Sequence, residues 1–490
     1  MGLEISEAMY AGLSKMDSTV LQEASTDAEK FNELLPLTIR SFSTSAIDAD
    51  GLINSFVKEI KSLMEERTNA STTDKNRKAV FSDLAVGISA VLQTRKDLGV
   101  GIPDEVFMTG NAWPDEVKPF RISAFGMDDY NSSDVILKYG NVYYGISLKK
   151  KAFFNANPPT LINNAFSSFF KGQEFTKLNM EMMDAKTRFF AKVIFDACQD
   201  ESPNSPFYVP EANDGKGGTI LECNQQYQTK PTKTLKSEKY SIKGMRLQSD
   251  GRLSISDAKR ILDIKVDIWR KNSKGDWELK KNVKLLQLKD PRFLANISTE
   301  FPTEFKTRFR DYVNKSLYAT NGKISELWTT FVDIMNDDRP RQGGKSIKQA
   351  MVDSLFTRIL KLDLYTQLEK IKRNDFKFYL VTGVGRALKP RGSEMFSPKV
   401  EQATTKSLSS ILANLAELCP DDCLKTIEFL EASATEASVA LVLSVTPKGS
   451  SAKVPILNIK LRYAGNFSAY PRFEATMTKE FLSYGKKKST

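Results

Sequence analysis

The sequence contains no histidine in 490 residues, and this absence removes several kinds of chemistry. A chain without an imidazole cannot form a Ser-His-Asp or Cys-His catalytic arrangement, a histidine-dependent phosphodiesterase centre or a histidine-ligated zinc site. Chemistry that uses carboxylates, lysine and a hard cation remains open, because Mg²⁺ and Mn²⁺ prefer oxygen ligands.

Cysteine is scarce, and no apolar run is long enough to span a bilayer. The four cysteines, Cys198, Cys223, Cys419 and Cys423, lack the spacing of a metal-binding cluster, so we expect reduced, structural thiols. No secretory signal is present. These features predict a soluble, cytoplasmic (intracellular) protein without a membrane partner.

Basic residues outnumber acidic ones, 71 to 60, which gives a net charge of +11. The excess is spread along the chain, with clusters at 149–151, 230–239, 280–281 and 486–488. Such a charge favours a polyanionic partner, and nucleic acid is the default choice. The hydrophobic fraction of 41% is ordinary for a globular protein and supports a substantial core.

Residues 132–151, with the sequence SSDVILKYGNVYYGISLKKK, predict a β-hairpin. Gly140-Asn141 favours a two-residue turn, and this turn fixes the register of the two strands. Alternation along the strands then gives one apolar face, which consists of Val135, Leu137, Tyr139, Val142, Tyr144, Ile146 and Leu148.

The other face of this hairpin carries Asp134, Ser147 and Lys149. In the predicted register Asp134 lies opposite Ser147, and directly opposed side chains are close enough to act on one bound ion or phosphate. A polar face that merely contacts water would show the same residues, and 149–151 would then be a solvated strand end that discourages edge pairing.

An aspartate on one strand and a residue-x-lysine on the next resembles the PD-(D/E)xK, or restriction-endonuclease-like, nuclease family, over at most residues 75–172. The resemblance implies a metal site in which Asp134 and the backbone carbonyl of Leu148 bind Mg²⁺ or Mn²⁺. It also implies that Lys149 positions the attacking water. The chain departs from the motif at its second acid, which is Ser147; this serine would bond a metal-bound water.

The missing acid requires a second source. Asp83 is the first candidate, because it is the only acid in the middle of a helix expected over 75–96; a solvent-facing acid is the alternative. Asp128 and Asp129, near the hairpin entrance, would supply carboxylates or act as turn residues. Weaker candidates are Glu174, Glu181 and Asp184, on the longer helix expected over 174–197.

We expect a mixed α/β fold with a restriction-endonuclease-like core, an N-terminal helical segment and a mixed α+β C-terminal region. The predicted divisions are a helical segment over 1–70, the nuclease-like core over 71–200, a linker or long loops over 201–240, and the mixed region over 241–490.

Apolar periodicity predicts helices over 28–42, 51–67, 75–96, 160–171, 174–197, 303–317, 324–335 and 346–371. Residues 71–74 resemble a capping box before the third of these helices, which ends at Gly99. Strands are expected over 120–125, 376–382, 438–446 and 455–463, and as a hairpin across 272–275.

Four further residues are predicted to contact nucleic acid. Lys150 and Lys151 adjoin the motif, and Asn163 would face the substrate from the helix expected after the hairpin. Arg386 follows Gly383-Val384-Gly385, which is either a phosphate-binding loop or a plain turn.

The leading functional hypothesis is a metal-dependent endonuclease that hydrolyses phosphodiester bonds of DNA, or of RNA. The alternative is a catalytically inactive nuclease-fold protein that binds nucleic acid or assembles in a virus or phage, inside an infected host cell. A homodimer or larger assembly is compatible with both hypotheses. A third hypothesis is a structural assembly protein whose positive charge is incidental.

Overall fold

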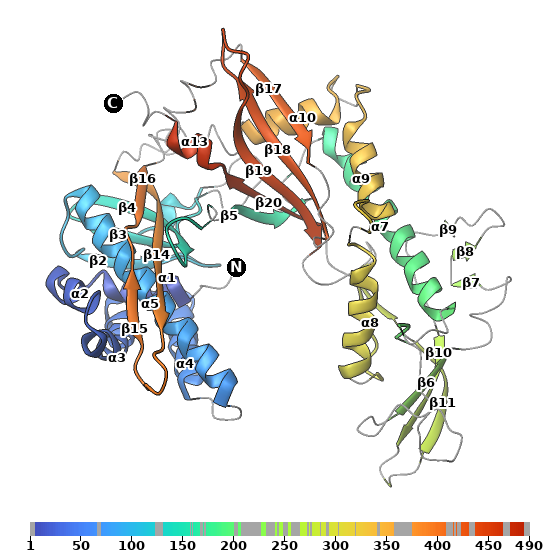
Figure 1. Ribbon diagram of the computed structural model, residues 1–490, viewed down its shortest axis with the longest axis horizontal. Helices are drawn as coiled ribbons and strands as arrows, with labels where there is room; N and C mark the ends of the chain where they lie inside the picture. Colours follow the sequence, from blue (N-terminus) through green and yellow to red (C-terminus); the bar gives the residue numbers. More distant parts are fainter. Residues whose placement is uncertain are drawn as a thin grey trace.

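The computed structural model describes residues 5–65, 70–122, 131–156, 158, 160–166, 170, 173–199, 204–206, 227–231, 241–242, 245–247, 253–255, 265–271, 274, 277–284, 286–290, 294–301, 303–318, 320–340, 344–356, 375–407, 415, 418, 423–430, 437–463 and 471–484. These residues form a mixed α/β protein (Figure 1), as the sequence predicted.

A mixed sheet of seven strands, counted over the described residues, organises the N-terminal part of the fold. Its order is β1-β2-β3-β4-β14-β15, and β16 also pairs with β14. The β1/β2 and β4/β14 pairs are parallel, and the other pairs are antiparallel. The strands are β1 (Ala46–Ile47), β2 (Glu105–Met108), β3 (Val135–Tyr139), β4 (Val142–Lys151), β14 (Phe376–Leu388), β15 (Ser397–Val400) and β16 (Thr404–Ser407).

Five helices, counted over the described residues, accompany this sheet: α1 (Ile5–Leu13), α2 (Ser18–Ala24), α3 (Ala28–Ser45), α4 (Leu52–Glu65) and α5 (Ala70–Leu98). α5 runs along β14 so closely that a Cβ on Gly383 would lie 2.6 Å from the carbonyl oxygen of Val86. The amide of Val384 donates to Ser89 Oγ of α5 (2.7 Å). The Gly383–Gly385 segment is therefore the interior of a strand under a helix, and its prediction as a turn or phosphate loop is wrong.

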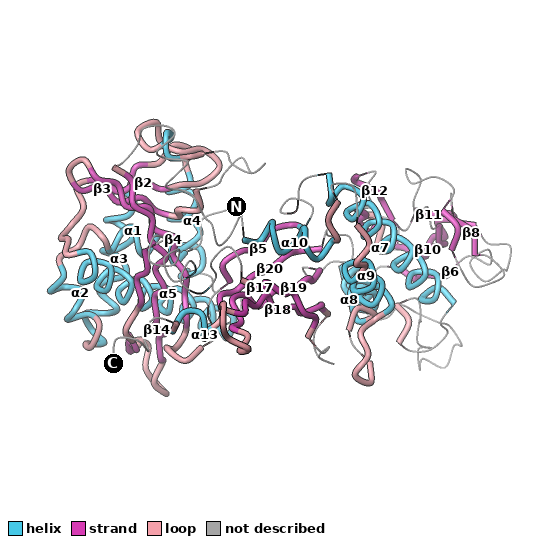
Figure 2. Tube along the Cα trace, turned by 90° about the horizontal axis from the view of Figure 1, so that it is seen from above, coloured by secondary structure: helices cyan, strands magenta, loops and turns pink. Residues whose placement is uncertain are grey.

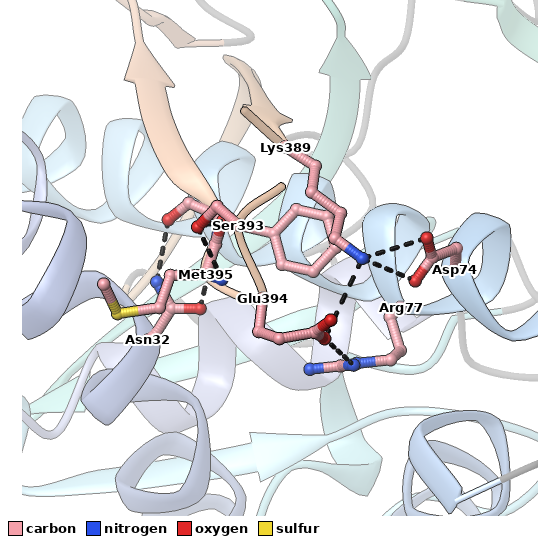
Figure 3. A network of polar contacts seen from close by, with 8 residues as sticks. Asn32, Asp74, Arg77, Lys389, Ser393, Glu394 and Met395 are labelled. Carbon is pink, nitrogen blue, oxygen red and sulfur yellow. Dashed lines mark hydrogen bonds and ion pairs between the residues drawn. The ribbon is translucent and has the colours of Figure 1, made fainter. Parts of the chain in front are cut away.

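The end of the β14–β15 hairpin is fastened to α3 and α5 (Figure 3). Asn32 donates to the carbonyl of Phe396 (2.7 Å) and accepts from its amide (3.1 Å). Lys389 pairs with Asp74 at 2.8 Å, and the Phe396 ring stacks on Phe81 with centroids 4.7 Å apart. These contacts join segments that are far apart in the chain and hold the long strand β14 against the helices.

The predicted β3–β4 hairpin and its register are confirmed. Val135 pairs with Ile146, Leu137 with Tyr144, and the turn at Gly140 has a φ of +58°. Positive φ at the first central residue of a two-residue loop suits glycine. The predicted apolar face is buried against the helices in a cluster that includes Val135, Leu137, Ile146 and Leu148.

The opposite face of the hairpin is not a uniformly polar surface. Near the turn it is covered by the segment 109–122, which contains a short 3₁₀ helix (Lys118–Phe120). Ile136 and Tyr143 are buried there in an aromatic-rich cluster with Phe107, Trp113, Val117, Phe120, Ile122, Phe376 and Phe378. The strand predicted around Phe120 is wrong at 118–120, because this segment packs across the sheet rather than within it; 123–125 lie outside the described residues.

A second sheet is antiparallel and has the order β17-β18-β19-β20-β5 in the described residues. Its strands are β5 (Thr160–Ala165), β17 (Leu424–Phe429), β18 (Ser438–Thr446), β19 (Val454–Tyr463) and β20 (Pro471–Met477), with α13 (Lys479–Ser483) after it. In the described residues, the helices of this core include α7 (Gln173–Gln199), α8 (Thr303–Lys315), α9 (Glu326–Asn336) and α10 (Ile347–Leu355). α10 contacts β17, and α9 contacts β18.

Smaller sheets lie beyond α7 and α8, at the end of the elongated molecule away from the seven-stranded sheet (Figures 1 and 2). β10 (Lys265–Lys271) pairs with β11 (Trp277–Lys284), which confirms the hairpin predicted across 272–275, and with β6 (Tyr227–Pro231). The remaining strands are β7 (Ser241–Ile242), β8 (Met245–Leu247), β9 (Leu253–Ile255), β12 (Leu286–Asp290) and β13 (Leu294–Ile297).

Three further sequence predictions are corrected by the fold. Residues 160–165, predicted as a helix, form β5, because pairing with β20 satisfies their backbone groups at the edge of the second sheet. The predicted capping box at 71–74 lies inside α5, where Asp74 pairs with Lys389 instead. Cys423 takes part in a disulfide bond rather than being a reduced thiol, because the fold, and not spacing along the chain, sets which sulfurs meet.

No helix in the described part of the chain combines the length and the apolar character needed to cross a membrane.

Candidate functional site

Asp134 lies directly before β3, where the regular pairing with β4 ends. Its amide donates to the carbonyl of Ile146 (2.8 Å), and its carboxylate Oδ2 accepts from the amide of Leu148 (2.7 Å). The Asp134 carbonyl accepts from Thr109 Oγ1 at 2.9 Å. The carboxylate thus takes the place that a backbone acceptor would have if β3 began earlier.

This bond also locates the carbonyl of Leu148. In a β-strand the N–H and C=O of one residue point toward the same neighbouring strand. Since the Leu148 amide points to Asp134, its carbonyl is directed to that same side of β4, past the start of β3. The two groups that the sequence predicted as metal ligands therefore come from one corner of the sheet.

Ser147 and Lys149 point to the face opposite the helices. Ser147 is buried, with 3% of its surface exposed, whereas Lys149 is half-buried and has no hydrogen bond or ion pair to a described residue. In the β4–β14 register Lys149 lies beside Thr382. A lysine ammonium that no described residue engages, two residues after a buried serine, is available to a ligand.

Asp83 lies on the other side of the sheet. It is 9% exposed on α5, and its Oδ1 is 3.2 Å from Lys150 Nζ. Lys150 alternates with Lys149 along β4, so it points to the helical face. The structure therefore brings Asp83 to the lysine beside the motif and not to the face of Ser147.

The donor set around Asp134 fits a hard cation. Mg²⁺ commonly takes one or two carboxylates, keeps several waters and accepts the remaining oxygens from phosphates of its substrate. Asp134 and the Leu148 carbonyl supply oxygen donors of this kind. Among the residues that the structure describes, no group of three or more acidic or cysteine side chains could hold a metal by itself.

The remaining acid candidates do not join this corner in the described residues. Asp128 and Asp129 lie outside them, as do the side chains of Glu174 and Asp184. Glu181 lies on α7, 3.9 Å from Lys177. Asn163, predicted to face the substrate, belongs to β5 opposite Glu474, and its side chain lies outside the described residues.

A row of basic residues shares the face of Ser147. Alternation places Lys149 and Lys151 on it, and the strand registers bring Arg386 of β14 and its cross-strand neighbour Lys399 of β15 to the same face. Arg386 was predicted as a loop residue and is instead a strand residue in this row. Lys399 carried no signal in the sequence, because its place depends on the pairing of β15 with β14.

The row ends where the two sheets meet. Lys406 of β16 donates to the carbonyl of Leu482 in α13 (2.8 Å), and Lys479 at the start of α13 donates to the carbonyl of Asn155 (3.3 Å). Burial, and secondarily the nearby Lys479, lowers the pKa of Lys151. Lys151, at the end of β4, and Lys479, which contacts the turn after it, thus bring two basic side chains to this end of the strand.

Comparison of this chain with protein families, with curated proteins and with solved structures found no match.

Proposed function

We propose that this protein hydrolyses phosphodiester bonds of nucleic acid with the help of Mg²⁺ or Mn²⁺, and that Asp134, Ser147, Leu148 and Lys149 form the reacting corner. The observation that carries this proposal is the bond from the Leu148 amide to the Asp134 carboxylate (2.7 Å). It fixes a carboxylate and a backbone carbonyl at one end of the hairpin, directly beside a lysine that has no partner among the described residues.

The chain's own groups have distinct tasks in this mechanism. A cation bound at this corner would polarise the scissile phosphate and lower the pKa of a bound water. Asp134 and the Leu148 carbonyl would hold the cation, and the Leu148 amide keeps the carboxylate oriented. Lys149 positions the attacking water and offsets negative charge on the phosphate. The Ser147 hydroxyl would donate to or accept from a water at this corner rather than hold the cation.

The surrounding charge supports a nucleic acid substrate. Lys149, Lys151, Arg386 and Lys399 follow one another across β4, β14 and β15 on a single face. Cations that cross several strands suit a polyanion, because each phosphate along the backbone meets another basic group. DNA is the first substrate to test and RNA the second, since backbone contacts of this kind serve both.

The test is a nuclease assay with Mg²⁺ and Mn²⁺ on single-stranded and duplex DNA and RNA, using Asp134→Asn and a matched control, Asp104→Asn. Asp104 also accepts a hairpin amide, from Gly140 (2.6 Å), but at the turn end of the same hairpin. Each variant exchanges a charged acceptor for a neutral one, a change of about 1 kcal/mol in stability.

We expect Asp134→Asn to lower cleavage by about 100-fold or more, because several kcal/mol of transition-state stabilisation depend on the cation. Asp104→Asn should cleave like the unaltered protein. Equal activity of the two variants, or no metal-dependent cleavage by the unaltered protein, contradicts the proposal.

A second candidate function is nucleic acid binding without cleavage. It is favoured by Asp83, which lies on the helical face with Lys150 and not beside Asp134. Under this alternative, binding is sensitive to salt but indifferent to Mg²⁺ and to Asp134→Asn.

A further inference from the structure

The turn that follows β4 carries two exposed aromatic rings. Phe153 is 47% exposed and Phe154 53% exposed, and only Ala152 separates them from the lysines at 149–151. Neither ring contacts another ring among the described residues. Two adjacent phenylalanines that stay exposed lose the favourable free energy that burying their rings would give. Such exposed apolar patches commonly mark a surface that binds another molecule.

This turn is held in place rather than loosely attached. The amide of Ala156 donates to the carbonyl of Phe153 (3.0 Å), and the amide of Phe154 donates to the carboxylate of Glu401 (2.8 Å). From the other side, Lys479 Nζ donates to the carbonyl of Asn155 (3.3 Å). Backbone groups are thus fixed from both sides while the two rings project outward.

The charge around the rings is positive. Lys151 lies two residues before Phe153, and Lys479 contacts the turn itself. The nearby acid, Glu401, is already engaged by the Phe154 amide and lies 3.8 Å from Lys399. Aromatic rings beside lysines are the combination that binds single-stranded nucleic acid, because bases stack on the rings and phosphates meet the ammonium groups.

We propose that Phe153 and Phe154 stack on unpaired bases of a single-stranded nucleic acid whose phosphates contact Lys151 and Lys479. The turn continues the strand that carries Ser147 and Lys149, so the bound strand is led directly to the candidate site. This inference rests on the proposed function for the class of polymer; the stacking itself requires neither the cation nor Asp134.

The test measures binding of fluorescent single-stranded DNA and RNA oligonucleotides and of the corresponding duplexes to the full chain. The aromatic variant is Phe153→Ala/Phe154→Ala, and its control is Tyr318→Ala, which removes an aromatic ring that is 41% exposed elsewhere in the molecule. The charge variant is Lys151→Gln/Lys479→Gln. A parallel arm measures binding to vesicles that contain anionic lipid.

We expect the aromatic variant to weaken single-strand binding by about 10-fold or more without changing its salt dependence. The charge variant should reduce the slope of log affinity against log salt by about 1.4, since each phosphate contact on a single strand contributes about 0.7. Tyr318→Ala should bind like the unaltered protein.

Single-strand affinity that is unchanged in the aromatic variant overturns the inference. So does loss of vesicle binding alone, which would assign the rings to a lipid surface. If the aromatic variant loses single-strand binding while Asp134→Asn changes nothing, the stacking surface stands and the proposed hydrolysis fails. If Asp134-dependent cleavage persists on single strands with both rings removed, the hydrolysis stands and the stacking surface fails.

Discussion

The two faces of the seven-stranded sheet differ in how uniformly apolar their side chains are. The helical face is apolar from the turn of the β3–β4 hairpin to Leu148, and it packs against α1 and α5 in one large cluster. The opposite face changes along the same strands. Ile136 and Tyr143 are buried near the turn, and then Ser147, Lys149 and Lys151 follow.

This difference separates the residues that specify the fold from those available for chemistry. A one-residue slip in register would expose every side chain of the helical face, so that face determines the register. Along β3 and β4 the opposite face is apolar where the segment 109–122 covers it. Beyond that cover its residues are free to be polar, and the candidate site lies there.

The largest expected effects come from deleting one apolar side chain on each face. Ile146→Ala on the helical face and Ile136→Ala on the opposite face each truncate a fully buried side chain and leave a cavity. Each should lower the free energy of unfolding by about 2–5 kcal/mol. Ile146→Ala should cost more, because packed helices cannot collapse into the cavity, whereas the segment 109–122 can shift toward it.

Hydrogen exchange of the β3 and β4 amides measures this pair of variants, since it reports the local opening of these strands in a chain with more than one core. Equal losses of protection, or a larger loss for Ile136→Ala, would contradict the claim that the helical face is the more rigid one.

The hairpin was predictable because its register depends on local signals. Gly140-Asn141 and the alternation from Val135 to Leu148 specify the turn and the pairing without reference to any distant segment. The helices α3, α4, α5 and α7 were predictable for the same reason, since each shows apolar residues at helical spacing.

The environment of the hairpin was not predictable. β14 pairs in parallel with β4 from a distant part of the sequence. Only this pairing places Val384 beside Lys151 and Arg386 two residues further along on the same face. The bond from Leu148 to Asp134 depends on β3 ending early, which alternation cannot reveal. Residues 160–165 became a strand because β20 offered an edge, which overrode helical spacing.

An intermediate loss of stability is expected from a substitution where α5 packs against β14. Gly383→Ala places a Cβ 2.6 Å from a helix backbone oxygen, and overpacking of this kind costs about 1–3 kcal/mol. The control is Gly101→Ala, where a Cβ meets nothing within 4 Å. Urea unfolding should show a lower midpoint for Gly383→Ala alone. A midpoint equal to that of the control would show that the helix can move away from the sheet, and the contrast in rigidity between the faces would then be lost.

The smallest expected change in stability comes from an ionic network at the turn end of the opposite face. Lys138 Nζ lies 2.6 Å from carboxylate oxygens of both Glu105 and Glu116, and the Tyr143 hydroxyl donates to Glu116 at 2.5 Å. The Lys138 bond, followed by the Tyr143 bond, lowers the pKa of Glu116 below its ordinary value of 4.5. This network stabilises the closed, buried end of that face rather than the candidate site.

A depressed carboxyl pKa contributes stability that is present above pH 4.5 and is lost as the pH falls through the lower, folded-state pKa. Glu116→Gln should therefore lower the free energy of unfolding at pH 7 by about 1 kcal/mol or less, since the group is partly exposed and screened by solvent. The difference from the unaltered protein should shrink toward zero as the pH falls well below 4.5. Asp115→Asn is the control, because that side chain is 99% exposed and 3.7 Å from Lys118. A difference in urea midpoint that persists or grows in acid would mean that Glu116 acts through packing instead. The turn end would then be stabilised by packing, as the helical face is.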